Sequence, residues 1–268
     1  MASSSIRTLA LVGAVGGAGT TRTALECAAA LARDDRTVAV LDAAYATQGL
    51  SDAVPGRIDP DMTELCLDSE RPLAQGLLNL DLPVDGRVAV APAHAPFERL
   101  ARANAPEAAQ ALAERVSEAA AHFDHVIVDV PPVATNPAVA AVHAVDRVAI
   151  VAPDTEHGAD GRRRQRDVLR DIDAPDSDPA ILTVATSESP AVVDGGGAGD
   201  DDANVTATVP GGPKSFAAAP ACLGDDAFAA AVVRAAETLF EAEVAVEFED
   251  RSVVSRISDG VNLVRGGD

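Results

Sequence analysis

A glycine-rich turn near the start of the chain has the composition of a phosphate-binding loop. Apolar residues 8–12 precede it, and residues 13–19 read GAVGGAG before an alanine- and leucine-rich stretch of helical pattern. In the order strand, loop, helix, the loop's backbone N–H groups converge at the positive end of the helix dipole, where a phosphate chain binds without side chains. Glycine is required because the backbone must come close to the phosphate oxygens. The residues expected to form this cradle are Gly16, Gly17, Ala18, Gly19, Thr20, Thr21 and Arg22.

Two aspartates stand at the ends of apolar runs. Asp42 closes residues 37–42, TVAVLD, and Asp129 lies within residues 123–132, FDHVIVDVPP. A carboxylate at such a strand terminus is where phosphate-loop enzymes hold Mg²⁺, directly or through water. Asp129 and the hydroxyl of Thr21 are therefore the predicted metal ligands if a nucleotide binds. By residue type alone, Asp42 can also be a cap of a turn or helix.

The complete Walker A motif, Gly-x-x-x-x-Gly-Lys-[Ser/Thr], includes a lysine that reaches the β- and γ-phosphates. Here Thr20 occupies that position. The order of the glycines resembles the deviant Walker A motif of the ParA/MinD family, Lys-Gly-Gly-x-Gly-Lys-Thr-Thr, which maps onto residues 15–22. Both family lysines are missing, because Val15 stands at the signature lysine and Thr20 at the loop lysine.

Further segments resemble this family in the correct order, over about residues 7–240. Residues 37–42 resemble its Walker A′ segment, with Ala44 in place of the second aspartate. The resemblance puts Asp42 near the attacking water and so implies that it is the one candidate for a residual catalytic role. Residues 123–132 resemble its Walker B segment. The asparagine that reads adenine in family members is replaced, since residues 185–187 read ATS.

The resemblance implies a doubly wound α/β fold, a mostly parallel sheet with helices on both faces. It also implies Mg-ATP as the possible ligand and a protein partner, either an active MinD/ParA paralogue or a second copy of the chain. The apolar runs agree with this fold, because continuous rather than alternating runs, such as residues 8–12, are typical of parallel strands buried on both faces. Residues 106–122 show the apolar stripe of an amphipathic helix.

Composition narrows the classes of partner. The 268 residues carry a formal charge of −21, hydrophobic residues make up 47%, and Lys214 is the only lysine. Such a surface repels DNA and anionic lipid, so we expect neither nucleic acid nor membrane as a partner. The same acidic, lysine-poor composition is typical of proteins from extreme halophiles, in which molar salt screens the self-repulsion.

The three cysteines show no paired spacing, which predicts neither a structural metal site nor a disulfide framework. The N-terminus shows no signal-peptide pattern, so we expect a cytoplasmic protein. We expect one P-loop domain over residues 1–242, with a flexible acidic, glycine-rich loop at 187–204. Residues 243–268 are expected to form a tail with at most a short helix. The arginines at 162, 163, 164 and 166 suggest either a phosphate- or DNA-binding patch or, as we favour, a solvated face paired with nearby aspartates.

Three functional hypotheses follow from the missing lysines. A single cationic group at a phosphoryl-transfer transition state is worth about 10³–10⁵ in rate. We therefore favour a protein with weak or no ATP hydrolysis that acts as a regulator or scaffold in cell division, partition or spatial positioning. The alternatives are a slow ATPase whose cation comes from Arg22, from K⁺ or from another subunit, and a structural, partner-binding protein that takes no nucleotide.

Overall fold

The structure of the protein is a computed structural model, and it describes residues 6–176, 178–186, 205–212, 220–246 and 248. Within these residues one sheet of eight strands lies in the order β3-β4-β2-β5-β1-β6-β7-β8. The pairing of β3 with β4 is antiparallel, and every other pairing is parallel. The strands are β1 (Thr8–Gly13), β2 (Thr37–Asp42), β3 (Leu78–Asn79), β4 (Arg87–Ala91), β5 (His125–Val130), β6 (Arg147–Pro153), β7 (Ala180–Val184) and β8 (Ala207–Val209).

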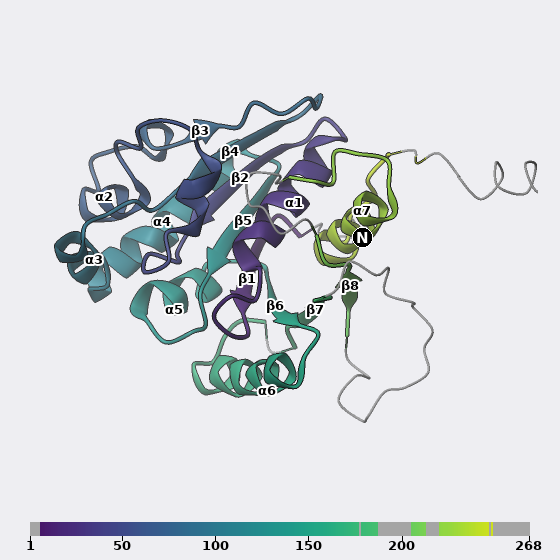
Figure 1. The fold of residues 1–268 in the computed structure, drawn as a ribbon. Helices are drawn as coiled ribbons and strands as arrows, with labels where there is room; N and C mark the ends of the chain where they lie inside the picture. Colours follow the sequence, from purple (N-terminus) through teal and green to yellow (C-terminus); the bar gives the residue numbers. More distant parts are fainter. Residues whose placement is uncertain (1–5, 177, 187–204, 213–219, 247, 249–268) are drawn as a thin grey trace, which may run out of the picture.

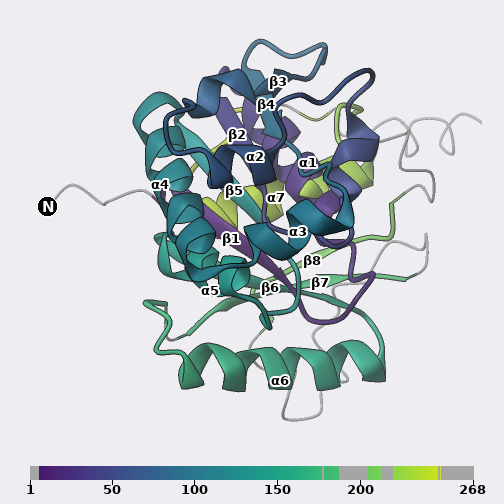
Figure 2. The ribbon, with the colours of Figure 1, turned by 90° about the vertical axis from the view of Figure 1, so that its left-hand side faces the viewer.

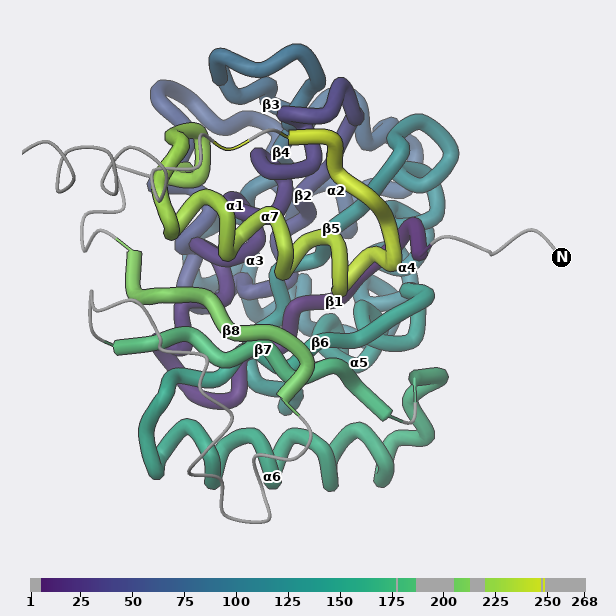
Figure 3. Tube along the Cα trace, turned by 90° about the vertical axis from the view of Figure 1, so that its right-hand side faces the viewer, coloured from purple at the N-terminus to yellow at the C-terminus, as the bar shows by residue number. Residues whose placement is uncertain are grey.

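Helices cover both faces of the sheet, as Figure 1 shows. On one face lie α1 and α7, which pack against each other (Figure 3). On the other lie α2, α4 and α5, with α6 beside β6 and β7 (Figure 2). The helices are α1 (Thr20–Ala32), α2 (Met62–Leu67), α3 (Phe97–Ala103), α4 (Pro106–His122), α5 (Asn136–His143), α6 (Glu156–Asp171) and α7 (Ala227–Phe240), with two short 3₁₀ turns, η1 (Gly49–Ala53) and η2 (Leu73–Gln75).

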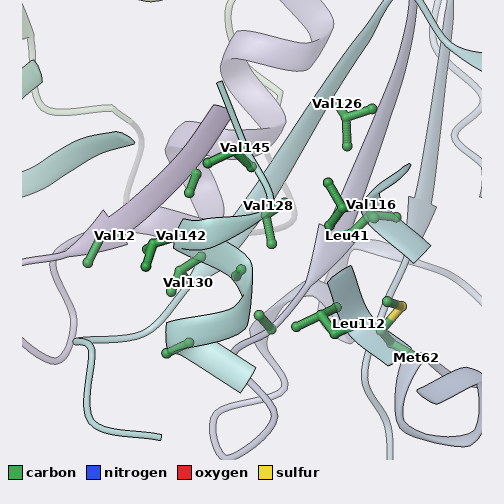
Figure 4. Close-up of a cluster of buried hydrophobic side chains, with 14 of the residues drawn as sticks. Val12, Leu41, Met62, Leu112, Val116, Val126, Val128, Val130, Val142 and Val145 are labelled. Carbon is green, nitrogen blue, oxygen red and sulfur yellow. The ribbon is translucent and has the colours of Figure 1, made fainter. Parts of the chain in front are cut away.

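The central strands supply both hydrophobic cores because their successive side chains point to opposite faces. On β1, Leu9 and Leu11 join the core under α1 and α7, whereas Ala10 and Val12 join the core under the other helices. Figure 4 shows the second core, in which valines of β5 meet side chains of α2, α4 and α5. Burial on both faces explains why these strands are apolar throughout.

The parallel register places the two strand-end aspartates beside each other. Asp42 on β2 is paired in register with Asp129 on β5, and Leu11 on β1 is paired with Asp129 on its other side. The loop that follows β1 therefore leaves the sheet at the edge where both aspartates lie. Residues far apart in the chain meet there because parallel strands present all their carboxyl ends at one edge.

The predicted doubly wound, mostly parallel α/β fold is confirmed. Helix α6 begins at Glu156, because the side chain of Thr155 caps it by accepting the N–H of Gly158. The sequence patterns described above did not predict helix α3. The predicted loop at 187–204 lies outside the described residues, as does most of the predicted tail.

The described part of the tail packs on the domain. Val244, Val246 and Phe248 contact the core under α1 and α7. The guanidinium of Arg36 donates to the carbonyl of Glu243, and Arg33 lies 5.2 Å from the centre of the Phe248 ring. The chain thus continues along the domain beyond residue 242. Among the described residues no helix combines the length and apolar composition needed to cross a membrane.

Candidate phosphate-binding site

The glycine-rich turn links β1 to α1, as predicted. The N–H of Ala14 donates to the carbonyl of Val151 on β6 over 2.8 Å, which fixes the start of the loop to the sheet. Gly17 and Gly19 have φ angles of +75° and +85°, a region that a side chain would disfavour. Gly19 is also the N-cap of α1. The loop therefore depends on glycine at the two positions where the backbone turns toward the helix.

The loop glycines lie beside open space, and the first turn of α1 carries no carboxylate. Gly19 caps α1 without a side-chain hydrogen bond, and the first turn of the helix holds no acidic residue. A Cβ built on Gly16, Gly17 or Gly19 would meet no atom within 4 Å among the described residues. Open space thus lies beside the loop glycines at the positive end of the α1 dipole, where a phosphate chain binds. The N–H of Ala18 is already engaged, because it donates to the carbonyl of Val15 over 3.3 Å.

Neither residue at the two lysine positions supplies a charge. Val15 is buried, and its Cγ1 lies 2.5 Å from the position that a Cβ on Gly161 of α6 would take. Val15 is therefore part of an internal contact with α6. The hydroxyl of Thr20 lies 3.0 Å from the position of a Cβ on Gly13, so this side chain turns back toward the end of β1.

Arg22 is the nearest cation in sequence to the loop. Its Nε and Nη2 donate to Glu26 Oε1 over 3.0 and 2.9 Å, one helical turn further along α1. Glu26 is buried and also accepts the N–H groups of Ala221 and Cys222, at distances of 2.8–2.9 Å. The charge of Arg22 is therefore balanced inside the protein. Sequence reasoning did not single out Glu26, because the two backbone N–H groups that it accepts lie 195 and 196 residues away in the chain.

The two aspartates form a buried pair at the carboxyl edge of the sheet. Asp42 Oδ1 accepts the N–H of Ala44 over 2.8 Å, and its Oδ2 accepts the N–H of Ala93 over 3.0 Å. Burial, followed by the neighbouring charge of Asp129, raises the pKa of Asp42 to about 8. Burial likewise raises the pKa of Asp129 to about 6, against the effect of a hydrogen bond with Thr21. The pair is thus costly to ionise fully without a cation.

The residues fit a magnesium ion. Asp129 Oδ2 is buried and has no hydrogen-bond partner among the described residues, and the Thr21 hydroxyl lies beside the same carboxyl group. Mg²⁺ is commonly held by one or two carboxylates together with phosphate oxygens and water. The Thr21 hydroxyl also lies 3.2 Å from the position of a Cβ on Gly49, so the backbone of η1 approaches it closely. Among the described residues no cluster of three or more His, Cys, Asp or Glu side chains could hold a metal by itself.

The arginine cluster of α6 is only partly the solvated face that we favoured. Arg163 pairs with Asp160 over 2.7 Å in an exposed position, which agrees with that interpretation. Arg162, in contrast, is buried, and the Nε of Arg166 is buried without a partner among the described residues. Gln165, on the buried side of the same helix, accepts the N–H of Val133 over 2.9 Å. One side of α6 is thus an internal surface that the charge pattern did not indicate.

Comparison with known proteins gives the fold. No protein-family model matches the sequence, and no curated protein matches it. Among solved structures, a ParA family ATPase from Chlorobium tepidum superposes with a TM-score of 0.68 at 18% identity, covering 87% of this chain and 98% of that one. The septum site-determining protein MinD from Pyrococcus horikoshii, complexed with Mg-ADP, gives 0.69 at 19% identity, covering 86% and 94%.

A MinD cell division protein from Aquifex aeolicus superposes with a TM-score of 0.66 at 18% identity, covering 90% of this chain and 100% of that one. The fold is therefore that of the ParA/MinD-like P-loop NTPases, and the loop and the aspartate pair lie at the carboxyl edge of the same kind of sheet. At these identities the comparisons establish the fold alone.

Proposed function

We propose that this chain is a ParA/MinD-like protein that retains phosphate binding at the loop of residues 13–19 but hydrolyses ATP weakly or not at all. The observation that carries the proposal is a formed cradle without a cation of its own. Val15 and Thr20 are neutral, and Arg22 is paired with the buried Glu26. Backbone N–H groups and the helix dipole remain available to a phosphate chain.

Electrostatics explains why such a site binds better than it reacts. Phosphoryl transfer depends almost entirely on positioning and on stabilising the charge of the transition state. Loss of one cationic group lowers the rate of ATP hydrolysis by about 10³–10⁵. Binding of ATP before the reaction depends less on these groups, because the loop amides also contact the phosphates. A bound Mg²⁺ would supply part of the missing charge, and Asp129 with Thr21 would hold it. Asp42, fixed by two backbone N–H groups, would orient water beside it.

The proposed role is that of a regulator or scaffold in cell division, partition or spatial positioning in the cytoplasm. The solved structures of this fold include a MinC:MinD cell division protein complex, which supports a protein partner. We propose a second copy of this chain or an active paralogue as that partner. The charge of −21 argues against DNA and against anionic lipid surfaces.

A slow ATPase is the second candidate, and one observation favours it. Asp42 and Asp129 are both present and buried at the same edge of the sheet, so the groups that would hold metal and water in an active site are retained. In that case K⁺ or a cation from another subunit would supply the missing charge.

Calorimetric titration with Mg-ATP in molar KCl, run beside a phosphate-release assay, separates the candidates. Binding without turnover supports the proposal, and binding with sustained turnover supports the slow ATPase. The absence of binding would overturn both and leave a structural protein that takes no nucleotide. The variant Gly19→Ala is the control, because alanine is disfavoured by about 1–2 kcal/mol at the φ of +85° that Gly19 adopts, and we expect it to weaken binding.

A further inference from the structure

A buried carboxylate lies outside the loop site, at the start of α2. Asp61 is the N-cap of this helix, and its Oδ1 accepts the N–H of Glu64 over 3.1 Å and the hydroxyl of Thr63 over 2.9 Å. Capping requires no more than such bonds. Its Oδ2 also accepts the N–H of His94 over 2.6 Å, from the segment that follows β4. Asp61, which is 1% exposed, therefore ties α2 to a second part of the chain.

The segment that follows β4 connects Asp61 to Asp42. The carbonyl of Pro92 accepts the N–H of Met62 over 2.9 Å, and the N–H of Ala93 donates to Asp42 Oδ2 over 3.0 Å. The next N–H along the chain is the one that Asp61 accepts. The residues on both sides of Ala93 are thus hydrogen-bonded to the start of α2. These bonds fix the position of the Ala93 N–H and, with it, that of Asp42 Oδ2.

Arg99 completes this connection from α3, which lies beside α2 in Figure 1. Its Nη2 lies 3.3 Å from Asp61 Oδ1 and donates to the carbonyl of His94 over 3.0 Å, and its Nη1 donates to Glu64 Oε1 over 2.6 Å. A planar guanidinium can make these contacts together because its donors are held in a fixed fork. One side chain therefore balances the charge of the buried cap and holds the segment that this cap binds.

Asp42 depends on this assembly for one of the two hydrogen bonds that hold its carboxyl group. Its Oδ1 accepts the N–H of Ala44 within its own turn, and its Oδ2 accepts the N–H of Ala93. The terminal torsion of an aspartate is broad, so bonds to both oxygens are needed to fix its rotation. The orientation of Asp42 beside Asp129, its partner in register on β5, is therefore imposed in part from α2 and α3.

Groups that orient the residues around a metal affect its binding without touching it. Loss of such an outer partner typically lowers metal affinity or activity by about 10–100-fold. We propose that Arg99 and Asp61 are positioning residues of the magnesium site, which hold Asp42, through the backbone of residues 92–94, in the orientation in which it would bind water of the ion. The inference rests on the proposed function in that it takes Mg-ATP to bind beside Asp129.

A double-mutant cycle tests the inference, with the dissociation constant of Mg-ATP for the full chain measured by calorimetry in molar KCl. We expect Arg99→Ala to raise this constant by about 10- to 100-fold in the natural background. In an Asp42→Ala background the same substitution should change it by less than about threefold, because no carboxyl group is left to position. If Arg99 only stabilised the fold, it would weaken binding by the same factor in both backgrounds, and that result would overturn the inference.

The variant Asp42→Ala should itself still bind Mg-ATP, because the loop, Thr21 and Asp129 remain. Complete loss of its binding would contradict a role confined to orienting water and would overturn the inference. Lack of binding by the natural protein would overturn the proposed function as well. Binding by the natural protein with an unchanged constant in Arg99→Ala would overturn the inference alone.

Two further variants separate positioning from the stability of α2. Asp61→Asn keeps the size of the cap but removes its charge and one acceptor oxygen, and it takes the place of Arg99→Ala in the same cycle if that variant does not fold. Arg71→Ala is the matched control, because it breaks an exposed ion pair with Asp68 at the other end of α2. We expect the control to leave the dissociation constant of Mg-ATP unchanged, and an effect equal to that of Arg99→Ala would contradict the inference.

Discussion

Restoring the loop lysine is the most informative perturbation of the site. Thr20 is the first residue of α1, and its hydroxyl turns back toward Gly13, at the base of the loop. A lysine at this position has a stem long enough to extend past the loop toward a bound phosphate chain. If the missing charge is what weakens the site, Thr20→Lys should tighten Mg-ATP binding substantially.

The size of the gain follows from the contact that the lysine would make. A hydrogen bond to a charged group is worth about 1.5–3 kcal/mol, which corresponds to about a 10- to 150-fold lower dissociation constant. Molar salt shortens the Debye length to about 3 Å, so direct contact survives while long-range attraction is screened. Calorimetry in molar KCl therefore measures the contact itself.

Thr20→Met is the matched control, because it lengthens the side chain without adding charge, and we expect no gain from it. Val15→Lys should also bring no gain, since Val15 is packed against Gly161 and its side chain is part of an internal contact. Unchanged Mg-ATP affinity in a folded Thr20→Lys protein would refute the reasoning. It would mean that the cradle is closed or misshapen rather than short of charge.

Three further predictions concern the elements around the loop. The free energy of unfolding should fall as pH rises from about 4 to about 8, because Asp42 and Asp129 keep protons in the folded chain over a range where the unfolded chain has lost them. Denaturant titrations at constant KCl measure this dependence. If the free energy of unfolding of Asp42→Asn depended on pH as steeply as that of the natural protein, the prediction would be wrong. Glu26→Gln should lower the free energy of unfolding by about 3–5 kcal/mol, because it breaks the buried ion pair with Arg22. The control Asp160→Asn breaks the exposed pair with Arg163 and should cost less than about 1 kcal/mol. Equal effects of the two variants would show that the Arg22–Glu26 pair does not stabilise the fold. Gly161→Ala should destabilise the protein by about 1–3 kcal/mol despite alanine's higher helix propensity, because the new Cβ would lie 2.6 Å from the Ala14 carbonyl oxygen. Thermal unfolding measures the change. A melting temperature above that of the natural protein would show that α6 does not pack this closely on the loop.

The architecture was predicted from the resemblance to the ParA/MinD family, and local sequence patterns agreed with it. Continuous apolar runs predicted the buried strands, and the periodicity of residues 106–122 predicted α4 with its observed bounds. The glycine-rich turn was correctly placed between a strand and a helix. These features succeed because each is encoded by neighbouring residues, either in the period of burial or in the backbone freedom of glycine.

Long-range packing could not be predicted in the same way. Gly158 and Gly161 weaken the helical pattern of α6, yet both are needed because the helix packs closely on Pro153 and on the loop backbone. The burial of Arg162 and the role of Glu26 depend on partners far away in the sequence. Whether Asp42, Asp129 and the loop residues bind Mg-nucleotide stays a prediction.

The central claim is that the chain keeps the phosphate cradle and lacks the charges that drive hydrolysis. Its most direct test is the rate of phosphate release at saturating Mg-ATP in molar KCl, measured beside Asp42→Ala. We predict a release rate that is at or near the background and that Asp42→Ala leaves unchanged. Sustained, magnesium-dependent release that is abolished in Asp42→Ala would contradict the account.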